Sequence, residues 1–214
     1  MHLFLFLFLS YLIGSISGSI FLGKIKGIDI RKLGSGNAGG TNAFRTVGAL
    51  FAIGVVFIDI IKGYIAVKYI PLLNFNFLQN VIIDNEIILI ICGVGSVLGH
   101  VYPIYHGFKG GKGAGTLVGV LAAIYPQAII ICIGIWLLIL VLTGYVGLST
   151  IMSSLSFPIY YIFYLNNNYF TPLGFFSIII PIFIIFTHRS NILRMLTGQE
   201  NRFKKIMIFN QNEK

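Results

Sequence analysis

Charge is scarce in this sequence: Asp, Glu, Lys and Arg make up only 10% of its 214 residues, and only 6 residues are acidic. About 25% of a typical soluble domain is charged, so the shortage argues against a water-soluble protein. The 15 basic residues give a formal net charge of +9, which could serve nucleic-acid binding. They stand in short segments beside apolar runs, however, and the positive-inside rule and anionic lipid headgroups explain that placement better. We expect a membrane partner and no nucleic acid.

Cysteine is nearly absent as well. Cys92 and Cys132 lie in separate apolar runs, without a CxxC pair or a cluster of metal ligands. Such residues behave as small buried hydrophobes, so neither a disulfide nor a metal site is predicted. The first apolar run, Leu3–Gly23, also lacks the basic segment and the small-residue cleavage site of a signal peptide.

Apolar residues, by contrast, make up 57% of the chain, and the mean hydropathy is +0.90. Runs near twenty residues, long enough to cross a bilayer as a helix, recur along the whole sequence. We therefore predict an all-α, polytopic integral membrane helical bundle, with a single domain over 1–214. The predicted spans are Leu3–Gly23, Val47–Ile70, Ile87–Val101, Thr116–Leu142, Val146–Leu165 and Pro172–Thr187.

The distribution of lysine and arginine predicts the orientation. Lys24–Thr46 is rich in basic residues and should be cytoplasmic, whereas Pro71–Glu86 has none and should lie outside. The third predicted span returns the chain to the cytoplasm before Thr116, and the basic tail after Thr187 should also be cytoplasmic. An even number of membrane crossings must therefore separate Thr116 from the tail. Splitting the long run at Pro126 into two short helices satisfies this condition. The result is about seven transmembrane helices with the N-terminus outside, and one span plus a re-entrant piece remains the alternative.

Gly34–Arg45, GSGNAGGTNAFR, is the most unusual of the cytoplasmic stretches. It carries hydroxyls, amides and a guanidinium but no acid. Gly36, Gly39 and Gly40 are expected to take positive φ and to let the backbone approach a ligand. Converging N–H groups with the fork of Arg45 would suit a phosphate or a carboxylate. The alternative is a flexible connector, which would not need so many donors.

A second glycine-rich segment, Gly99–Thr116, sets Lys109 and Lys112 among several glycines. It is not a Walker A motif, because the spacing is one residue short and Gly113 stands where Ser or Thr would bind Mg²⁺. A general anion cradle fits better than a nucleotide site. His100, at the start of this segment, could be a base or an interfacial histidine satisfied by backbone.

Two further clusters admit two readings each. His188, Asn191 and Arg194 share roughly one helix face, either as part of a site or on a basic helix lying on anionic lipid. Asp59 and Lys62 lie inside the second span, where ionisable groups are expensive and usually functional. They could form a mutual ion pair, or Lys62 could face a cytoplasmic cavity and hold an anion.

Together these segments resemble the PlsY family, the acyl-phosphate:glycerol-3-phosphate acyltransferases of bacterial phospholipid synthesis. The resemblance runs nearly end to end and rests on GIDIRKLGSGNAGGTNAFRTVG, DIIKG, GHVYPIYHGFKGGKGAGT and HRSNILRMLTGQE. It implies transfer of an acyl group from acyl phosphate to the sn-1 hydroxyl of glycerol 3-phosphate in the bacterial inner membrane, with no cofactor. Ser17-Gly18, Gly40 and Gln199 depart from the family pattern without touching a charged or nucleophilic position.

Carried over by motif and chemistry, the expected catalytic residues are Ser35, Asn37, Arg45, His188 and Asn191. The residues expected to bind substrate are Gly36, Gly39, Thr41, Asn42, Lys62, His100, Lys109, Gly110, Gly111, Lys112, Gly113, Arg194 and Glu200. An acyl phosphate is already activated, so proximity and electrostatic stabilisation would suffice without a covalent intermediate. Either His188 or a substrate phosphate would take the proton. The rival function, a membrane anion transporter, would require inverted repeats, and none is visible.

Overall fold

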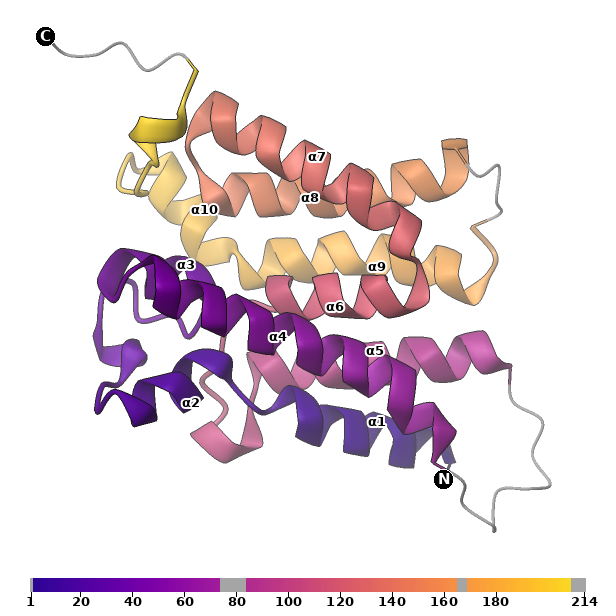
Figure 1. Ribbon diagram of the computed structural model, residues 1–214. Helices are drawn as coiled ribbons and strands as arrows, with labels where there is room; N and C mark the ends of the chain where they lie inside the picture. Colours follow the sequence, from indigo (N-terminus) through magenta and orange to yellow (C-terminus); the bar gives the residue numbers. More distant parts are fainter. Residues whose placement is uncertain (1, 74–83, 165–168, 209–214) are drawn as a thin grey trace, which may run out of the picture. The chain divides into compact units, whose positions relative to one another are not determined.

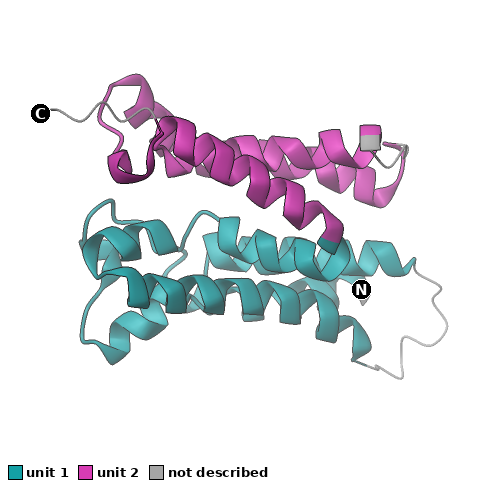
Figure 2. Ribbon diagram, turned by 45° about the horizontal axis from the view of Figure 1, so that its top comes forward, with its two compact units in different colours: residues 1–126 teal, residues 127–214 magenta. Residues whose placement is uncertain are grey.

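The computed structural model describes residues 2–73, 84–164 and 169–208, and the regular elements of these residues are all helical (Figure 1). The chain divides into two compact units, residues 1–126 and 127–214, each described here by itself (Figure 2). The first unit contains α1 (His2–Gly14), α2 (Gly18–Ile25), η1 (Ile30–Lys32), α3 (Gly40–Thr46), α4 (Ala49–Tyr69), η2 (Ile70–Leu72), α5 (Asn85–Val101), η4 (Ile104–His106) and α6 (Ala114–Ile124). The second contains α7 (Pro126–Thr143), α8 (Val146–Ile159), a π-helical turn (Tyr160–Tyr164), α9 (Pro172–Thr187), α10 (Arg189–Leu196) and η6 (Lys204–Ile206).

The all-α membrane bundle predicted from hydropathy is confirmed. Four described segments are long and apolar enough to cross a bilayer: Leu3–Ile25, Ala49–Leu72, Asn85–His106 and Val146–Phe163. Helices α9 and α10 qualify only as a pair bent by 57°, and α6 and α7 are shorter apolar helices. The long predicted run is thus two helices that meet at Tyr125, as the argument from Pro126 required. The count of seven crossings and the single domain stay predictions. Most of the predicted external connection Pro71–Glu86 lies outside the described residues, within 74–83.

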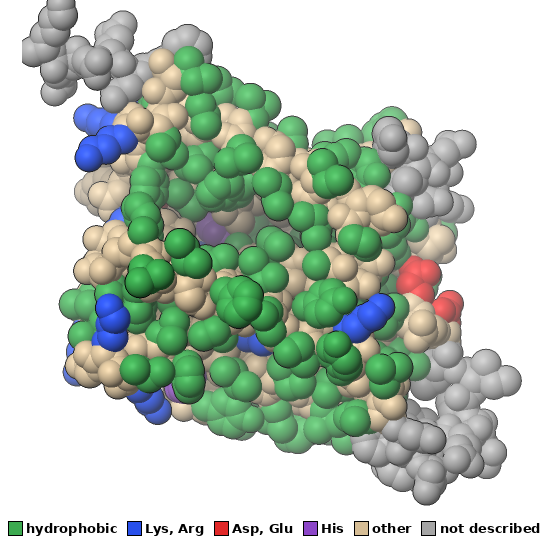
Figure 3. Space-filling model, viewed as in Figure 1, with side chains coloured by type: hydrophobic (Ala, Val, Ile, Leu, Met, Phe, Trp, Pro, Cys, Tyr) green, Lys and Arg blue, Asp and Glu red, His purple; other side chains and the backbone are tan. Residues whose placement is uncertain are grey.

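Large apolar side chains face outward along the helices. Leu50 is 85% exposed, Ile130 78% and Phe163 80%. Apolar side chains also cover most of the face shown in Figure 3. Such exposure would be an aggregation liability in water but is the normal surface of a protein in lipid.

Glycines bring the helices of the first unit close together. Helix α5 packs along α1, and the backbone of α1 lies where a Cβ on Gly95 or Gly99 would have to go. Helix α6 packs along α4 in the same way, with Gly63 against Thr116 and Gly119 against Ile60. Small residues at helix contacts are the usual means of tight packing in membranes, where apolar side chains gain nothing by leaving lipid.

The first apolar run differs from its prediction, because it is broken between Gly14 and Gly18. Ser17 has extended backbone angles, and its hydroxyl caps α2 by accepting from the N–H of Ile20 at 3.5 Å. A break at membrane depth exposes backbone polar groups, which must find partners inside the protein. Two charged side chains of α4 supply them, as described below.

Candidate active site

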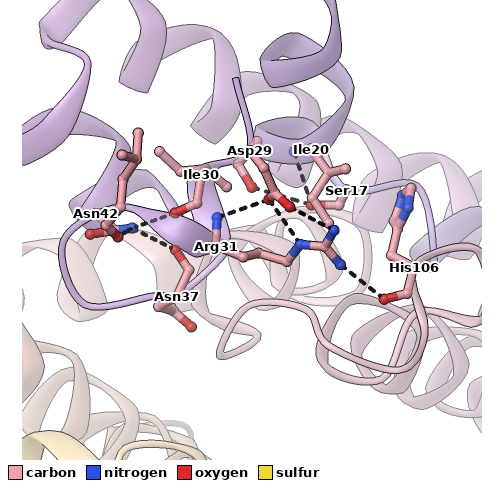
Figure 4. Close-up of polar contacts among 10 residues, drawn as sticks. Ser17, Ile20, Asp29, Ile30, Arg31, Asn37, Asn42 and His106 are labelled. Carbon is pink, nitrogen blue, oxygen red and sulfur yellow. Dashed lines mark hydrogen bonds and ion pairs between the residues drawn. The ribbon is translucent and has the colours of Figure 1, made fainter. Parts of the chain in front are cut away.

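Asn42 organises the first glycine-rich loop from within. Its side chain is buried, and Nδ2 donates to the carbonyls of Ile30 at 3.2 Å, Leu33 at 2.9 Å and Asn37 at 3.1 Å. Its Oδ1 accepts from the backbone N–H of Ser35 at 3.0 Å. Figure 4 shows the amide between the carbonyls of Ile30 and Asn37. These four contacts fix the shape of the loop, and the expectation that Asn42 also binds substrate stays a prediction.

The loop turns at only one of the three glycines that were expected to take positive φ. Positive φ occurs at Gly34 and Gly36, at +56° and +72°, whereas Gly39 is extended and Gly40 begins α3. Gly40 serves close packing, since a Cβ there would lie 2.5 Å from Cγ2 of Val56 on α4. The prediction of positive φ was therefore right for Gly36 and wrong for the other two, because α3 starts earlier than the glycine pattern indicated.

The remaining donors of this segment lie around the same turn. Ser35 is exposed, Asn37 is half-buried, and Thr41 and Arg45 follow within the short helix α3. These side chains therefore project from one rigid frame. The sequence contains no acidic residue between Gly34 and Arg45 that would oppose an anion.

Asp29 and Arg31 hold the segment before this loop, a role that sequence reasoning missed. The Arg31 guanidinium binds both carboxylate oxygens of Asp29, each at 3.0 Å, and Nη1 donates to the carbonyl of His106 at 3.2 Å (Figure 4). The hydrogen bonds from Arg31 lower the pKa of the Asp29 carboxyl below its usual range, so the pair stays ionised at neutral pH. The link ties the first loop to the chain that enters the second.

The second glycine-rich loop makes two left-handed turns. Gly107 and Phe108 have φ of 64° and 60°, and Gly113 has 91° where it begins α6. A left-handed phenylalanine is unusual and indicates that the surrounding contacts determine the backbone here. The N–H groups of Gly110 and Gly111 bond back to the carbonyls of Val101 and His100, at 3.2 and 3.1 Å. Lys109 is exposed and Lys112 half-buried on this frame.

The two glycine-rich loops meet at Gly111. A Cβ on this residue would clash with Nε2 of the His100 ring and would lie 3.1 Å from the carbonyl oxygen of Ala38. Ala38 is fully buried in the middle of the first loop. Two motifs far apart in the sequence are thus packed together through buried residues, and glycine is required where they touch.

Beneath this junction lies a buried charged cluster. Asp59 and Lys62 on α4 pair at 2.9 Å, and Nδ1 of His100 lies 2.9 Å from the Lys62 ammonium and 3.4 Å from Asp59. Each of the three residues is 3% exposed. The mutual ion pair is therefore formed, and Lys62 is enclosed by protein rather than turned toward an open cavity.

In the second unit, His188 lies between α9 and α10. Its ring Nδ1 lies 2.9 Å from the carbonyl oxygen of Ile184 and 3.3 Å from the hydroxyl of Thr187. A carbonyl can only accept, so Nδ1 carries a proton, and Nε2 is the nitrogen that would accept in the corresponding neutral tautomer. The ring is buried and held by α9, so its orientation is fixed.

Glu200 binds two side chains of the third motif, HRSNILRMLTGQE, those of Asn191 and Arg194. The chain turns at Gly198, whose φ is +70°, and returns the Glu200 carboxylate to α10. There it accepts from Asn191 Nδ2 at 3.0 Å and from Arg194 Nε at 2.6 Å. The shared face of Asn191 and Arg194 is thus present, and Glu200 is their common partner.

Fold and site define the class: a helical integral membrane protein that presents donor-rich, glycine-rich loops. The sequence model of the family described as glycerol-3-phosphate acyltransferase matches residues 4–198. Glycerol-3-phosphate acyltransferases of Chlorobium limicola and Chlorobaculum tepidum are each 41% identical, over 90% of this chain and 93% of the relative. The chain belongs to this family, and the resemblance to PlsY proteins is confirmed.

Solved structures agree. The crystal structure of PlsY (YgiH), an integral membrane glycerol 3-phosphate acyltransferase, in its glycerol 3-phosphate form is 36% identical to this chain. It superposes with a TM-score of 0.81 over 95% of this chain and 96% of its own. The lysophosphatidic acid form of the same protein gives a TM-score of 0.78.

Proposed function

We propose that this chain transfers an acyl group from acyl phosphate to the sn-1 hydroxyl of glycerol 3-phosphate, giving lysophosphatidic acid and inorganic phosphate. The observation that carries the proposal is the packing of Gly111 against Ala38 and His100. This contact brings the two glycine-rich loops together, which supports one shared site for their donors. Both proposed substrates carry phosphate, and such a surface suits phosphate through backbone N–H groups and cationic side chains.

The second loop is assigned to a substrate phosphate. Gly110 and Gly111 hold the loop in shape through their N–H bonds to Val101 and His100, and Gly113 leads it directly into the N-terminus of α6, where the helix dipole favours an anion. Lys109 and Lys112 add positive charge on the same frame. The motif match adds Gly36, Gly39 and Thr41 of the first loop as substrate contacts.

Ser35, Asn37 and Arg45 are assigned to the reacting centre. The attacking oxygen forms a bond to the acyl carbon, the bond from that carbon to phosphate oxygen breaks, and phosphate leaves. Donors aimed at the carbonyl oxygen and at the departing phosphate stabilise charge that develops in the transition state. Within the first unit, Ser35 makes its hydrogen bond through its backbone N–H to Asn42, and no histidine or carboxylate is bonded to its hydroxyl among the described residues of that unit. Direct transfer therefore suits the site better than an acyl-serine intermediate.

His188 and Asn191 are assigned to catalysis on the strength of the third motif. With Nδ1 donating to Ile184, the Nε2 of His188 can accept a proton, as a general base requires. A substrate phosphate is the alternative acceptor. Arg194 would bind a second phosphate, and Glu200 would position Arg194 and Asn191 rather than meet an anionic substrate itself.

The same reasoning gives Asn42 a positioning part, because its amide is engaged with loop backbone. The proposed setting is the bacterial inner membrane, with the N-terminus outside and the C-terminus and site cytoplasmic. The hydrogen bond between Arg31 and His106 supports one side for both loops. Cysteine labelling near Ser35 and Gly110, in a background without Cys92 and Cys132, tests that orientation.

The function is tested with purified protein, glycerol 3-phosphate and palmitoyl phosphate, with palmitoyl-CoA and palmitoyl acyl carrier protein as comparison donors. Lysophosphatidic acid and inorganic phosphate should appear in equal amounts from palmitoyl phosphate, with little product from either thioester. Faster turnover of a thioester would keep the family assignment but refute the proposed donor. Lys204→Ala, in the basic tail, serves as an active control variant.

A further inference from the structure

The charged cluster on α4 compensates the break in the first span. Helix α1 ends at Gly14 and α2 begins at Gly18, which leaves backbone groups without helical partners. The Lys62 ammonium donates to the carbonyl of Ile16 at 2.7 Å, and Asp59 Oδ1 accepts from the N–H of Gly18 at 3.3 Å. Each charge meets the backbone group of opposite polarity, as the dipoles of the two helix ends require.

The three N–H donors of a protonated Lys62 determine which of the surrounding atoms act as hydrogen-bond acceptors. A protonated ammonium has three N–H groups, and three acceptors surround it: Ile16 O, Asp59 Oδ1 at 2.9 Å and His100 Nδ1 at 2.9 Å. The ammonium is therefore saturated by protein atoms. With Lys62 protonated, His100 Nδ1 acts as an acceptor toward it, which places the proton of a neutral imidazole on Nε2. No donor of Lys62 is left for a substrate phosphate.

The opposite edge of the His100 ring faces the glycine-rich loops. A Cβ on Gly111 would clash with Nε2, so the ring edge lies directly against this glycine. The carbonyl of His100 also accepts from the Gly111 N–H at 3.1 Å, which holds the loop a second time. His100 is thus fixed by Lys62 on one edge and contacts the loop junction with the other.

The first span is tied to the same loop by a second route. Ser15, in the break, accepts from the N–H of Ile104 at 3.4 Å, and the Tyr11 hydroxyl donates to the carbonyl of Tyr102 at 2.7 Å. The segment between α5 and Gly107 is therefore anchored on the broken helix. Distortion of the break would reach the second loop through both routes.

We propose that Asp59, Lys62 and His100 form a positioning network for acyl transfer, in which the broken first span and the α4 ion pair hold His100 against Gly111 and thereby set the geometry of the two glycine-rich loops. The proposal rests on the proposed function for its kinetic consequence but not for its structural one. It replaces the expectation that Lys62 and His100 bind substrate directly. It also adds Asp59, which sequence reasoning placed only as a possible structural partner.

The structural consequence is measured without activity. Amide hydrogen exchange of peptides covering 102–113 reports the Gly110 and Gly111 N–H bonds to Val101 and His100. Lys62→Met should accelerate exchange there by at least tenfold in folded protein. Lys68→Met, the same change on an exposed lysine of α4, should leave it unchanged. Unchanged exchange in folded Lys62→Met would overturn the proposal.

A second variant distinguishes the proposal from a loss of folding, because Lys62→Met leaves the Asp59 carboxylate buried without its ion-pair partner. The double variant Asp59→Asn/Lys62→Met removes both charges and should fold more stably than the single one, with exchange at 102–113 still accelerated. Failure of the double variant to fold would assign the network to folding alone and overturn the proposal.

Kinetics separate a positioning role from a general loss of stability. Measured on folded enzyme, the KM of the double variant for a phosphate substrate should rise by about tenfold or more, because the loop that carries Lys109 and Lys112 is displaced. Wild-type KM and kcat in the folded fraction would contradict a positioning role. If wild type shows no acyltransferase activity with palmitoyl phosphate while exchange responds as predicted, the proposed donor fails and the network stands.

Discussion

Replacing Asn42 with alanine should release the first glycine-rich loop while the helices stay folded. The change removes two amide N–H groups, shared among three carbonyls, and one acceptor for the Ser35 N–H. Counted as about three hydrogen bonds at roughly 0.5–1.5 kcal/mol each, the local loss is ~1.5–4.5 kcal/mol. At about 1.4 kcal/mol per factor of ten, the ordered loop becomes ~10- to 10³-fold less populated against its disordered forms.

Formation of lysophosphatidic acid by purified Asn42→Ala should therefore fall by about one to three orders of magnitude in kcat/KM. Asn42→Asp, which keeps the shape but turns a carboxylate toward three carbonyls, should be worse than alanine. The matched control is Thr46→Val, which removes the 2.8 Å bond from the Thr46 hydroxyl to the Asn42 carbonyl but keeps the Cγ2 methyl that packs beside Gly34 of the loop. Activity of Asn42→Ala within twofold of wild type, in folded protein, would refute the reasoning.

Further substitutions probe the other contacts. Lys112→Ala should raise KM for a phosphate substrate by roughly 10- to 150-fold, the range for a lost charge-assisted hydrogen bond, whereas Lys205→Ala in the tail should change little; equal effects would argue against a specific phosphate loop. Glu200→Gln weakens the 2.6 Å hydrogen bond from Arg194 Nε and should raise KM for a phosphate substrate up to about tenfold. The melting temperature of the first unit's helices should not fall. An unchanged KM would contradict the role of Glu200 in positioning Arg194. Gly119→Leu should severely destabilise the packing of α6 on α4. Gly134→Leu is the control, because a Cβ there meets nothing within 4 Å, and it should leave the thermal stability unchanged. Similar thermal stability of the two variants would contradict close packing of α6 on α4.

Hydropathy was sufficient to predict the helical membrane class, because apolar runs of this length have few other stable forms. The split of the long run followed from Pro126, whose missing N–H and fixed φ interrupt a helix. The break near Ser17 was not predicted, although a serine followed by glycine can begin a helix. Its stability depends on Asp59 and Lys62, more than forty residues away, and hydropathy contains no information about that contact.

The motifs of the candidate site could be read from the sequence, but the contacts that their side chains make could not. Asn37 and Asn42 look alike in sequence, yet one is half-buried at the turn and the other is enclosed by loop carbonyls. Arg31 counted only as a basic residue of a cytoplasmic loop until its bond to His106 became visible. In each case the partner lies at a distance along the chain that no local pattern encodes.

The central claim is that the acyl group moves directly from acyl phosphate to glycerol 3-phosphate, with Ser35 as a donor and not as a nucleophile. A single-turnover experiment with palmitoyl phosphate, quenched over time and read by intact-protein mass spectrometry beside the lysophosphatidic acid product, tests this most directly. We predict product formation with no palmitoylated protein at any time, and none when palmitoyl phosphate is given alone. A stoichiometric acyl-Ser35 species that forms and decays at the rate of turnover would contradict the claim and establish a two-step mechanism.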